Sequence, residues 1–505
     1  MSDARRLATG SIAQQAAQVS GLLAMFVVIT VLARKLTLAE LGVYGLLNSL
    51  AGYLLIVQNA AAGAAVKAMA GAGDDERAGS AAFSTSALMY VAAGALAAVA
   101  LTAVGLILAA VLDLPDELAR QARLGAVAAG AVAFLGWPLT VYRDALRARS
   151  RFVLAAGAET VGIVASILLV LALVIADAPL WALIGTASSI PMLAGAACLV
   201  AARATALPWR LRPRLATRAA AREFLGLAGY ISLAEASSAA VYAGTRIILG
   251  TVRSAQTVGL YEGPIRAHNL IRALNGAVTV TVLPTAVRYR GEGDERRLGE
   301  LLVRGCRYAL AGVVPLAVTG AALAGPILDA WLGPRYAVAG PAMAIMMSHW
   351  VLNGVLGVTT ALLVALGAAR DLARWAMALG AATILLALAL VPSLGLDGAA
   401  LATAIPYVAL WPYMLFVTLR AVPAVRLGEL ARRAFAPAWM LGAVLAAALV
   451  AVRLTLDPSG ALAVIAIVAL SLTAYWAAYW RLALDDGERR LVKAMVGFVR
   501  AARAG

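Results

Sequence analysis

The chain has 505 residues, of which 63% are hydrophobic and 13% are charged. A single globular core cannot hide so much apolar surface from water, so lipid must be the solvent of this protein. The formal net charge of +16 raises the question of nucleic-acid binding. In a membrane protein, however, the distribution of basic residues among the loops has to be considered first.

Charge-poor stretches of about 20 residues or more recur along the chain, which is enough for a helix to cross a hydrocarbon core of about 30 Å. Each stretch is apolar throughout and does not alternate between apolar and polar residues. We therefore expect membrane-spanning helices and not a β-barrel. The first stretch is longer than a signal-peptide core and is expected to be a retained span. Fourteen spans are predicted: 10–33, 41–66, 80–112, 124–142, 152–176, 178–202, 224–250, 256–287, 308–328, 338–367, 375–393, 397–419, 434–452 and 460–480.

The basic residues predict the orientation of these spans. With a cytoplasmic N-terminus, the inside segments carry 32 of the 42 Lys and Arg, and the outside loops carry 7. This asymmetry predicts that both termini are cytoplasmic, with the basic loops facing anionic lipid headgroups. Nucleic acid is therefore not an expected partner. The tail, residues 483–505, is predicted to be an amphipathic helix on the cytoplasmic interface, with a solvated tail as the alternative.

The chain resembles itself at an offset of about 216 residues. Residues 30–33 and 41–44 overlay 247–250 and 258–261, and residues 187–191 overlay 402–406. The offset covers six spans, which predicts two parallel six-helix halves related by a pseudo-two-fold axis, as in transporters that rock around a central site. The predicted parts are 1–210, 211–425, two additional transmembrane helices in 426–482, and the cytoplasmic tail. Chance matching of small apolar residues is the alternative.

Charged and polar residues inside the eighth predicted span are candidates for a substrate cavity: Glu262, Arg266, His268, Asn269 and Arg272. Such residues are costly in lipid and should face a wet cavity. At 100° per residue, Glu262, Arg266 and Asn269 share one face, whereas Arg272 lies about 120° from Arg266. Two alternatives stay open. Glu262 and Arg266 could neutralise each other for packing alone, and Arg272 could reach the inner headgroups.

The seventh span adds Arg246, which faces either the cavity or the interface, and Glu235, which either binds a proton or sodium ion or pairs with an arginine. His349 is expected to be a packed core residue, and Glu159 is unassigned. Amides suited to sugar hydroxyls, or to hydrogen bonds between helices, are Gln14, Gln15, Gln18, Asn48, Gln58 and Asn59. The two cysteines, Cys198 and Cys306, predict neither a disulfide framework nor a metal site.

Four short motifs occur in order along nearly the whole chain. They are residues 32–34 with 41–44, residues 258–261, residues 331–336 with Ala342, and residues 395–403. In a frame of 14 spans they resemble the polysaccharide or O-antigen flippases of the multidrug/oligosaccharidyl-lipid/polysaccharide exporter superfamily. Members commonly carry an acidic residue late in the seventh span. The corresponding residue here is Thr245, which argues against cation coupling through that position.

The resemblance implies a flippase, not an enzyme, that moves undecaprenyl-diphosphate-linked oligosaccharides across the bacterial inner membrane by alternating access, for cell-surface or exopolysaccharide synthesis. The diphosphate would require cations, for which Arg266, Arg272 and Arg246 are the candidates. No cofactor is implied, although a proton or sodium gradient could drive transport, and a polysaccharide polymerase and a chain-length regulator are expected partners. The alternatives are a lipid II flippase, a multidrug/cation antiporter and a membrane-embedded polymerase. The last would need a large external loop and a catalytic motif, which the sequence does not show.

Overall fold

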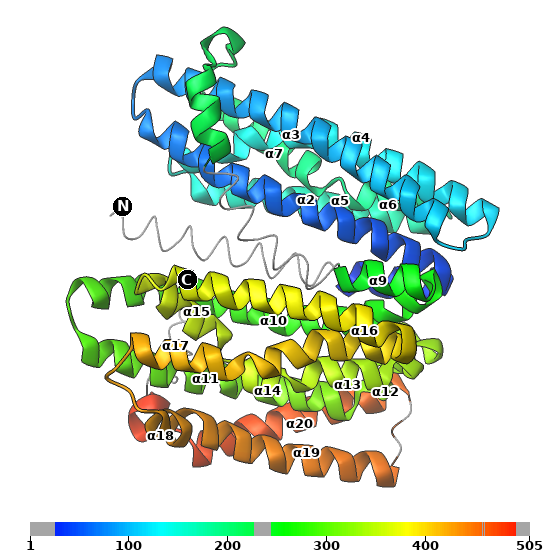
Figure 1. Ribbon diagram of the computed structural model, residues 1–505, viewed down its shortest axis with the longest axis vertical. Coiled ribbons are helices and arrows are strands. Elements are labelled where there is room, and N and C mark those ends of the chain that lie inside the picture. The colour runs from blue at the N-terminus through cyan, green and yellow to red at the C-terminus, as the bar shows by residue number, and fades with distance from the viewer. Residues whose placement is uncertain (1–25, 227–243, 457, 459, 491–505) are drawn as a thin grey trace, which may run out of the picture. The chain divides into compact units, whose positions relative to one another are not determined.

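The computed structural model describes residues 26–226, 244–456, 458 and 460–490 (Figure 1). All regular elements in these residues are helices, which confirms the predicted all-α class. Eight described helices are long and apolar enough to cross a membrane, and two bent pairs raise this number to ten. Most of the first and seventh predicted spans lies outside the described residues, so the number of fourteen spans stays a prediction.

The chain divides into two compact units, each built from two stretches of sequence. Unit 1 comprises residues 1–262 and 376–403, and unit 2 comprises residues 263–375 and 404–505. The predicted halves 1–210 and 211–425 follow the internal sequence repeat, whereas units 1 and 2 follow the contacts between residues. The two predicted halves therefore stay a prediction.

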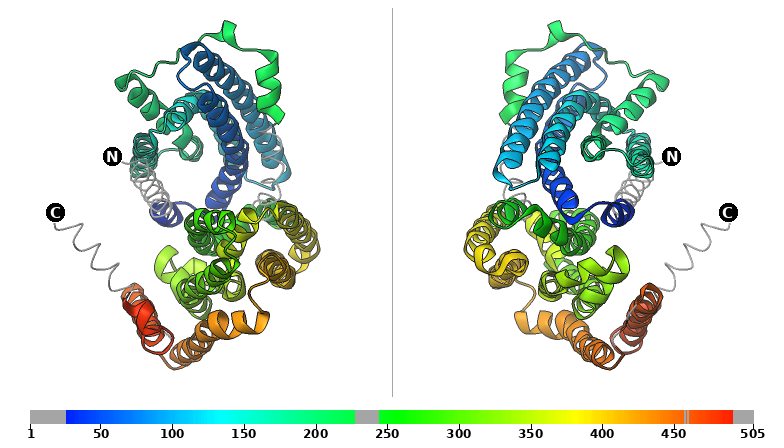
Figure 2. Two further views of the ribbon diagram at one scale, coloured as in Figure 1. Left: turned by 90° about the vertical axis from the view of Figure 1, so that its left-hand side faces the viewer. Right: turned by 90° about the vertical axis from the view of Figure 1, so that its right-hand side faces the viewer.

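Unit 1 is a bundle in which α4 packs against several neighbours. Figure 2 shows α3 and α4 side by side. Small residues allow the backbones of neighbouring helices such as these to approach closely. A Cβ added at Gly105 of α3 would lie 2.3 Å from the Cβ of Ala126 on α4. The helices are α2 (Leu38–Gly71), α3 (Glu76–Val111), α4 (Asp116–Ala148), α5 (Phe152–Ile175), α6 (Leu180–Ala187), α7 (Ile190–Ala204), η1 (Pro213–Leu215), α9 (Thr245–Val252), the start of α10 (Ala255–Gly291) and part of α16 (Ala369–Ala409).

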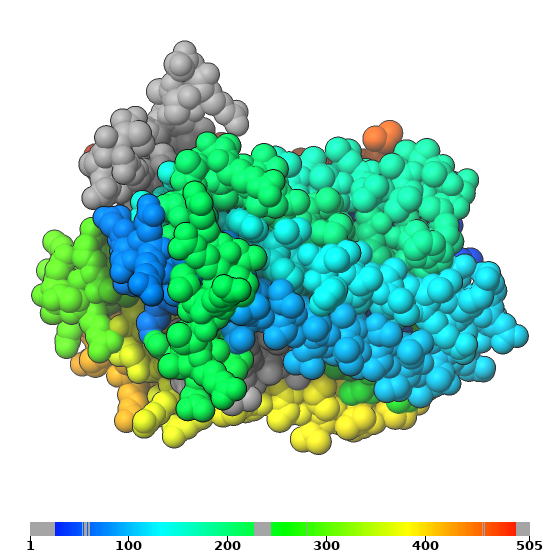
Figure 3. Space-filling model, turned by 90° about the horizontal axis from the view of Figure 1, so that it is seen from above, coloured from blue at the N-terminus to red at the C-terminus, as the bar shows by residue number. Residues whose placement is uncertain are grey.

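The segment after α7 is attached to α3. The backbone N–H groups of Arg210 and Arg212 donate to the hydroxyls of Ser80 (3.2 Å) and Ser84 (2.8 Å), both on α3. The side chain of Trp209 is buried against Gly79. Figure 3 shows this green segment lying over the blue residues near the start of α3. The connection is therefore held to the bundle by specific hydrogen bonds.

Unit 2 is organised around α11, which contacts α13, α14, α15, α19 and α20. Its helices besides most of α10 are α11 (Glu295–Ala322), α12 (Ala324–Leu332), η3 (Pro334–Ala339), α13 (Gly340–Ser348), α14 (Trp350–Asn353), α15 (Leu356–Ala365), the ends of α16, α17 (Trp411–Ala421), α18 (Leu427–Leu430), η4 (Ala431–Phe435), α19 (Ala436–Leu456) and α20 (Ala461–Leu482). Both helices predicted in 426–482 therefore pack within unit 2.

The span formed by α13, α14 and α15 is broken. Residues 334–353 and 356–365 meet at 46°. A break exposes backbone carbonyls that have no helical donor, and in a membrane these must find other partners. The indole N–H of Trp411 donates to the carbonyl of Leu352 (3.0 Å), and that of Trp439 donates to the carbonyl of Val351 (2.9 Å). Helices α17 and α19 thus stabilise the break.

Candidate functional site

A buried ion pair connects α9 and α10 in unit 1. The Nη2 atom of Arg246 lies 3.1 Å from Oε1 of Glu262. The Nη1 atom of the same guanidinium donates to the hydroxyl of Ser49 on α2, which in turn donates to the carbonyl of Gly45 (2.6 Å). The Glu262 side chain is fully buried and that of Arg246 is 11% exposed. Three helices therefore meet at one charge pair that is shielded from solvent.

Glycines allow α2 and α10 to approach closely enough for this contact. A Cβ at Gly45 would lie 2.4 Å from Oε1 of Glu262. A Cβ at Gly42 would lie 1.8 Å from the carbonyl oxygen of Ala255, and a Cβ at Gly259 would lie 2.1 Å from that of Leu38. Gly42 and Gly259 occupy equivalent places in the two copies of the repeated motif. The repeat thus places matched glycines where the starts of two helices touch.

Arg253 connects the end of α9 to the middle of α16. Its guanidinium donates to the carbonyls of Val391 (3.1 Å), Pro392 (2.7 Å) and Ser393 (3.0 Å). These carbonyls precede Gly395, where the backbone of α16 turns out of the helical region with a φ of 56°. Glycine adopts that conformation without steric cost. Arg253 thereby replaces the helical donors lost at the kink.

Arg266 was the predicted alternative partner of Glu262, and a pair with Arg246 was not predicted. The structure places Arg246 beside Glu262, in the interior of unit 1. Arg266, one turn further along α10, is itself 6% exposed. The predicted roles of these residues in substrate binding stay predictions.

Arg272 differs from Glu262 and Arg266, the other charged residues in the first half of α10, because its side chain is exposed. It is the eighteenth of the 37 residues of the helix, about 25 Å from either end at 1.5 Å per residue. Its Nε donates to the side-chain oxygen of Asn269 at 3.1 Å. A guanidinium within a hydrocarbon core would be costly unless water or an anion met it.

The structure describes the side chains of only some of the predicted amide residues. Gln58 is buried and donates to the hydroxyl of Thr140 on α4 at 3.4 Å, which is the hydrogen bonding between helices considered as its alternative role. Asn48 is half-buried. Gln14, Gln15, Gln18, Glu235 and the side chain of Asn59 lie outside the described residues.

Sequence reasoning missed a buried network in unit 1. Asp144 is fully buried and accepts hydrogen bonds from the hydroxyl of Tyr90 (2.5 Å) and from Nε of Arg143 (2.9 Å). Glu159, which was unassigned, accepts from Arg147 at 2.8 Å. The available signal was Glu159, a charged residue inside an apolar run. The pairing itself could not be foreseen, because Tyr90, Asp144 and Glu159 come from three helices.

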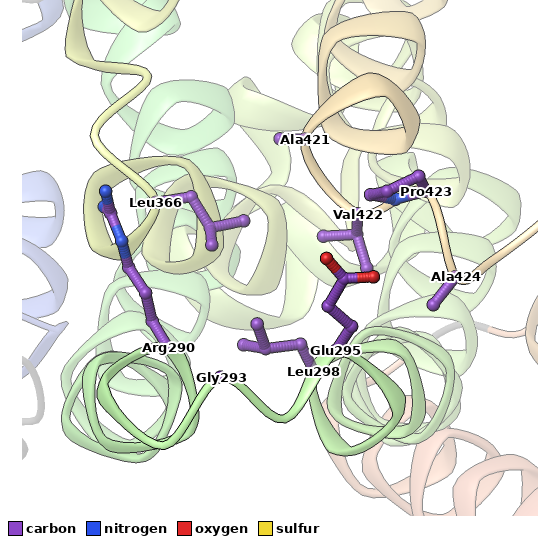
Figure 4. Close-up of a pocket in the computed structure, with 9 residues that line it drawn as sticks. All are labelled: Arg290, Gly293, Glu295, Leu298, Leu366, Ala421, Val422, Pro423 and Ala424. Carbon is purple, nitrogen blue, oxygen red and sulfur yellow. The ribbon is translucent and has the colours of Figure 1, made fainter.

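A cavity of about 180 Å³ lies in unit 2 between the end of α10, the start of α11 and the residues that follow α17. Figure 4 shows Arg290 on one side of it and Glu295 on the other. Arg290 donates to the carbonyl of Ala365 at 2.6 Å. The opposite charges and the apolar remainder of the lining do not select an anion. The described residues contain no group of three or more His, Cys, Asp or Glu that could hold a metal ion.

Solved structures share this fold. The chain is similar to the lipid II flippase MurJ in an inward closed conformation, with a TM-score of 0.71 and 14% identity over 94% of this chain and 99% of that chain. It is also similar to an inward-facing multidrug resistance MATE family transporter of the MOP superfamily (TM-score 0.66, 14% identity, 82% and 98% of the chains). The MATE transporter VcmN of Vibrio cholerae gives a TM-score of 0.58 at 15% identity over 83% and 98% of the chains. The chain therefore shares the fold of these transporters.

Residues 31–341 match the family model of a polysaccharide biosynthesis protein, and the chain belongs to that family. This finding confirms the predicted resemblance. A curated relative, the probable flippase AglR of Haloferax volcanii, is 30% identical over 185 residues. The match covers 36% of each chain, so it spans about a third of the length of that relative.

Proposed function

We propose that the protein is a flippase that moves undecaprenyl-diphosphate-linked oligosaccharides across a bacterial inner membrane by alternating access. Membership of a polysaccharide biosynthesis family supports a glycan substrate. The partial match to a probable flippase and the fold shared with a lipid II flippase support translocation of a lipid-linked molecule. We place both termini in the cytoplasm and expect a polymerase and a chain-length regulator as partners.

The exposure of Arg272 at the middle of α10 is the observation that carries this proposal. A diphosphate cannot enter hydrocarbon without compensating charge. A guanidinium supplies both the charge and paired donors that suit phosphate oxygens. Asn269 orients the Arg272 side chain through its 3.1 Å hydrogen bond, and Arg266 adds a second positive charge on the same helix. Arg272 is therefore the first contact we assign to the diphosphate.

Lipid II is the second candidate substrate, because it carries the same diphosphate and because the fold is shared with a lipid II flippase. An organic cation is disfavoured. Arg266 and Arg272 would repel it within one helix, and Glu262, the acidic residue of that helix segment, already pairs with Arg246.

The test uses the full-length protein in proteoliposomes that contain an undecaprenyl-diphosphate-linked oligosaccharide, with a glycan-cleaving enzyme added outside. Flipping should make the inner pool cleavable. Arg272→Ala should lower the rate at least tenfold at an equal amount of inserted protein, because the diphosphate loses its charge partner. Arg288→Ala is the matched control, since Arg288 is exposed near the end of the same helix. Transport of lipid II alone, or unchanged flipping by Arg272→Ala, would contradict the proposal.

A further inference from the structure

Both histidines of the chain lie together inside unit 2. His268 of α10 and His349, between α13 and α14, are 0% and 2% exposed, and their ring centroids are 5.2 Å apart. Burial of His349 confirms its prediction as a packed residue. The contact occurs where the span formed by α13, α14 and α15 is broken, and discontinuous helices are where transporter folds place ion sites.

Hydrogen bonding determines which nitrogens carry protons. The indole N–H of Trp350 points at Nδ1 of His268 at 3.1 Å, and Nε2 of His349 lies 3.3 Å from the same atom. An indole nitrogen can only donate, so Nδ1 of His268 must be an acceptor and the proton of His268 must be on Nε2. Nε2 of His349 faces the same lone pair and must then carry a proton. His268 is therefore neutral, and a neutral His349 of this tautomer carries a lone pair on Nδ1.

A second buried acceptor lies one helical turn away. The side-chain nitrogen of Asn353 donates to the carbonyls of His349 (3.1 Å) and Tyr407 (3.3 Å). Because carbonyls can only accept, they fix the orientation of the amide. Nδ1 of His349 and the side-chain oxygen of Asn353 are both buried, and neither has a hydrogen bond from the residues that the structure describes. Each unsatisfied buried group costs about 1–3 kcal/mol.

We propose that Nδ1 of His349 is a proton-binding site and that the oxygen of Asn353 accepts the hydrogen bond of the added proton. One proton taken from water would turn Nδ1 into a donor, and the side-chain oxygen of Asn353, four residues further along the chain, would be its acceptor. Tyr407 stacks on the ring of His349 at 4.7 Å and 7°, and the ring of Trp350 lies 4.9 Å away at 34°. Aromatic faces attract an imidazolium.

The groups around His349 favour it over His268 as the proton acceptor. His268 faces it from α10, Tyr407 from α16, and Trp350 and Asn353 from α14. Arg272 lies four residues after His268 on α10, and its positive charge would repel a second positive charge on that ring. Burial itself opposes a charged ring. The described conformation is thus the proton-free form, and the proton enters when water reaches the break.

Two histidines per chain make a direct test feasible. Histidine labelled with 15N in the full-length protein in nanodiscs gives two imidazole spectra, which His349→Gln assigns. Between about pH 8 and about pH 5, the range in which imidazoles titrate, Nδ1 of His349 should gain a proton while Nδ1 of His268 stays unprotonated. Asn353→Leu should weaken proton uptake about tenfold, because the protonated ring loses its acceptor.

Asn353→Asp should act in the opposite direction and strengthen uptake, which provides a second variant if Asn353→Leu does not fold. Thr359→Val is the matched control. It removes a buried hydroxyl of the same broken span that bonds only to backbone among the described residues, and it should leave the titration unchanged. Three results would overturn the proposal: a neutral His349 throughout the range, proton uptake by His268 first, or spectra that respond to sodium and not to pH. A bridging water would give the first of these.

Discussion

Arg246 and Glu262 belong to different helices, and their side chains form a buried ion pair with a nitrogen–oxygen distance of 3.1 Å. Removing two charges from water costs several kcal/mol per ion, and the mutual attraction of the pair offsets that cost. Loss of one partner leaves the other charge buried and uncompensated. This asymmetry makes the pair testable by comparing single and double variants.

Arg246→Ala should lower the free energy of unfolding by about 3–5 kcal/mol, and the double variant Arg246→Ala/Glu262→Ala should recover much of that loss. Thermal unfolding of the purified protein in detergent measures both effects. Arg374→Ala is the control, because Arg374 and Asp371 form an exposed pair that should contribute less than about 1 kcal/mol. A double variant as unstable as the single one would show that the pair is not the source of the loss.

Gly42 and Gly52 lie on the same helix and should respond oppositely to alanine. A Cβ at Gly42 would lie 1.8 Å from the Ala255 carbonyl oxygen, whereas a Cβ at Gly52 meets no described atom within 4 Å. Gly42→Ala should therefore force α2 and α10 apart and lower the melting temperature. Gly52→Ala should be neutral or stabilising by about 0.5–1 kcal/mol, because alanine favours the helix. Equal melting temperatures would argue against the close approach.

The orientation of the chain can be measured by thiol labelling. Single cysteines at Ser254 and Pro334 should react with an impermeant reagent from outside intact cells, and a cysteine at Thr217 should not, because basic loops stay in the cytoplasm. The natural thiols of Cys198 and Cys306 are fully buried and should give little background. Labelling at Thr217 as readily as at Pro334 would reverse the predicted topology.

Arg266 offers a separate test of charge recognition. Arg266→Ala should abolish flipping, and Arg266→Lys should retain part of it, because an ammonium keeps the charge but loses the forked donors. The measurement is the flipping rate per inserted protein, since Arg266 is 6% exposed and its loss can also reduce folding. Normal flipping by Arg266→Ala would remove this residue from the substrate site.

Composition and motif order were enough to predict the helical class and the family. The pairing of the charged residues was not predictable. Helical spacing relates Glu262 only to neighbours such as Arg266, whereas Arg246 reaches it across the turn between α9 and α10. The tryptophan bonds that stabilise the break at Val351 and Leu352 also come from distant helices. Periodicity within one helix carries no information about such contacts.

The composition of unit 1 has a consequence for biosynthesis. This unit is incomplete until residues 376–403 have been made, and the carbonyls that Arg253 binds are among them. A ribosome adding about 5–20 residues per second needs roughly 10–30 s to translate the chain from residue 262 to residue 403. During that interval the insertion machinery holds an N-terminal bundle whose Arg253 has not met its acceptors. Nascent chains stalled before residue 376 should therefore be more sensitive to protease than chains stalled after residue 403.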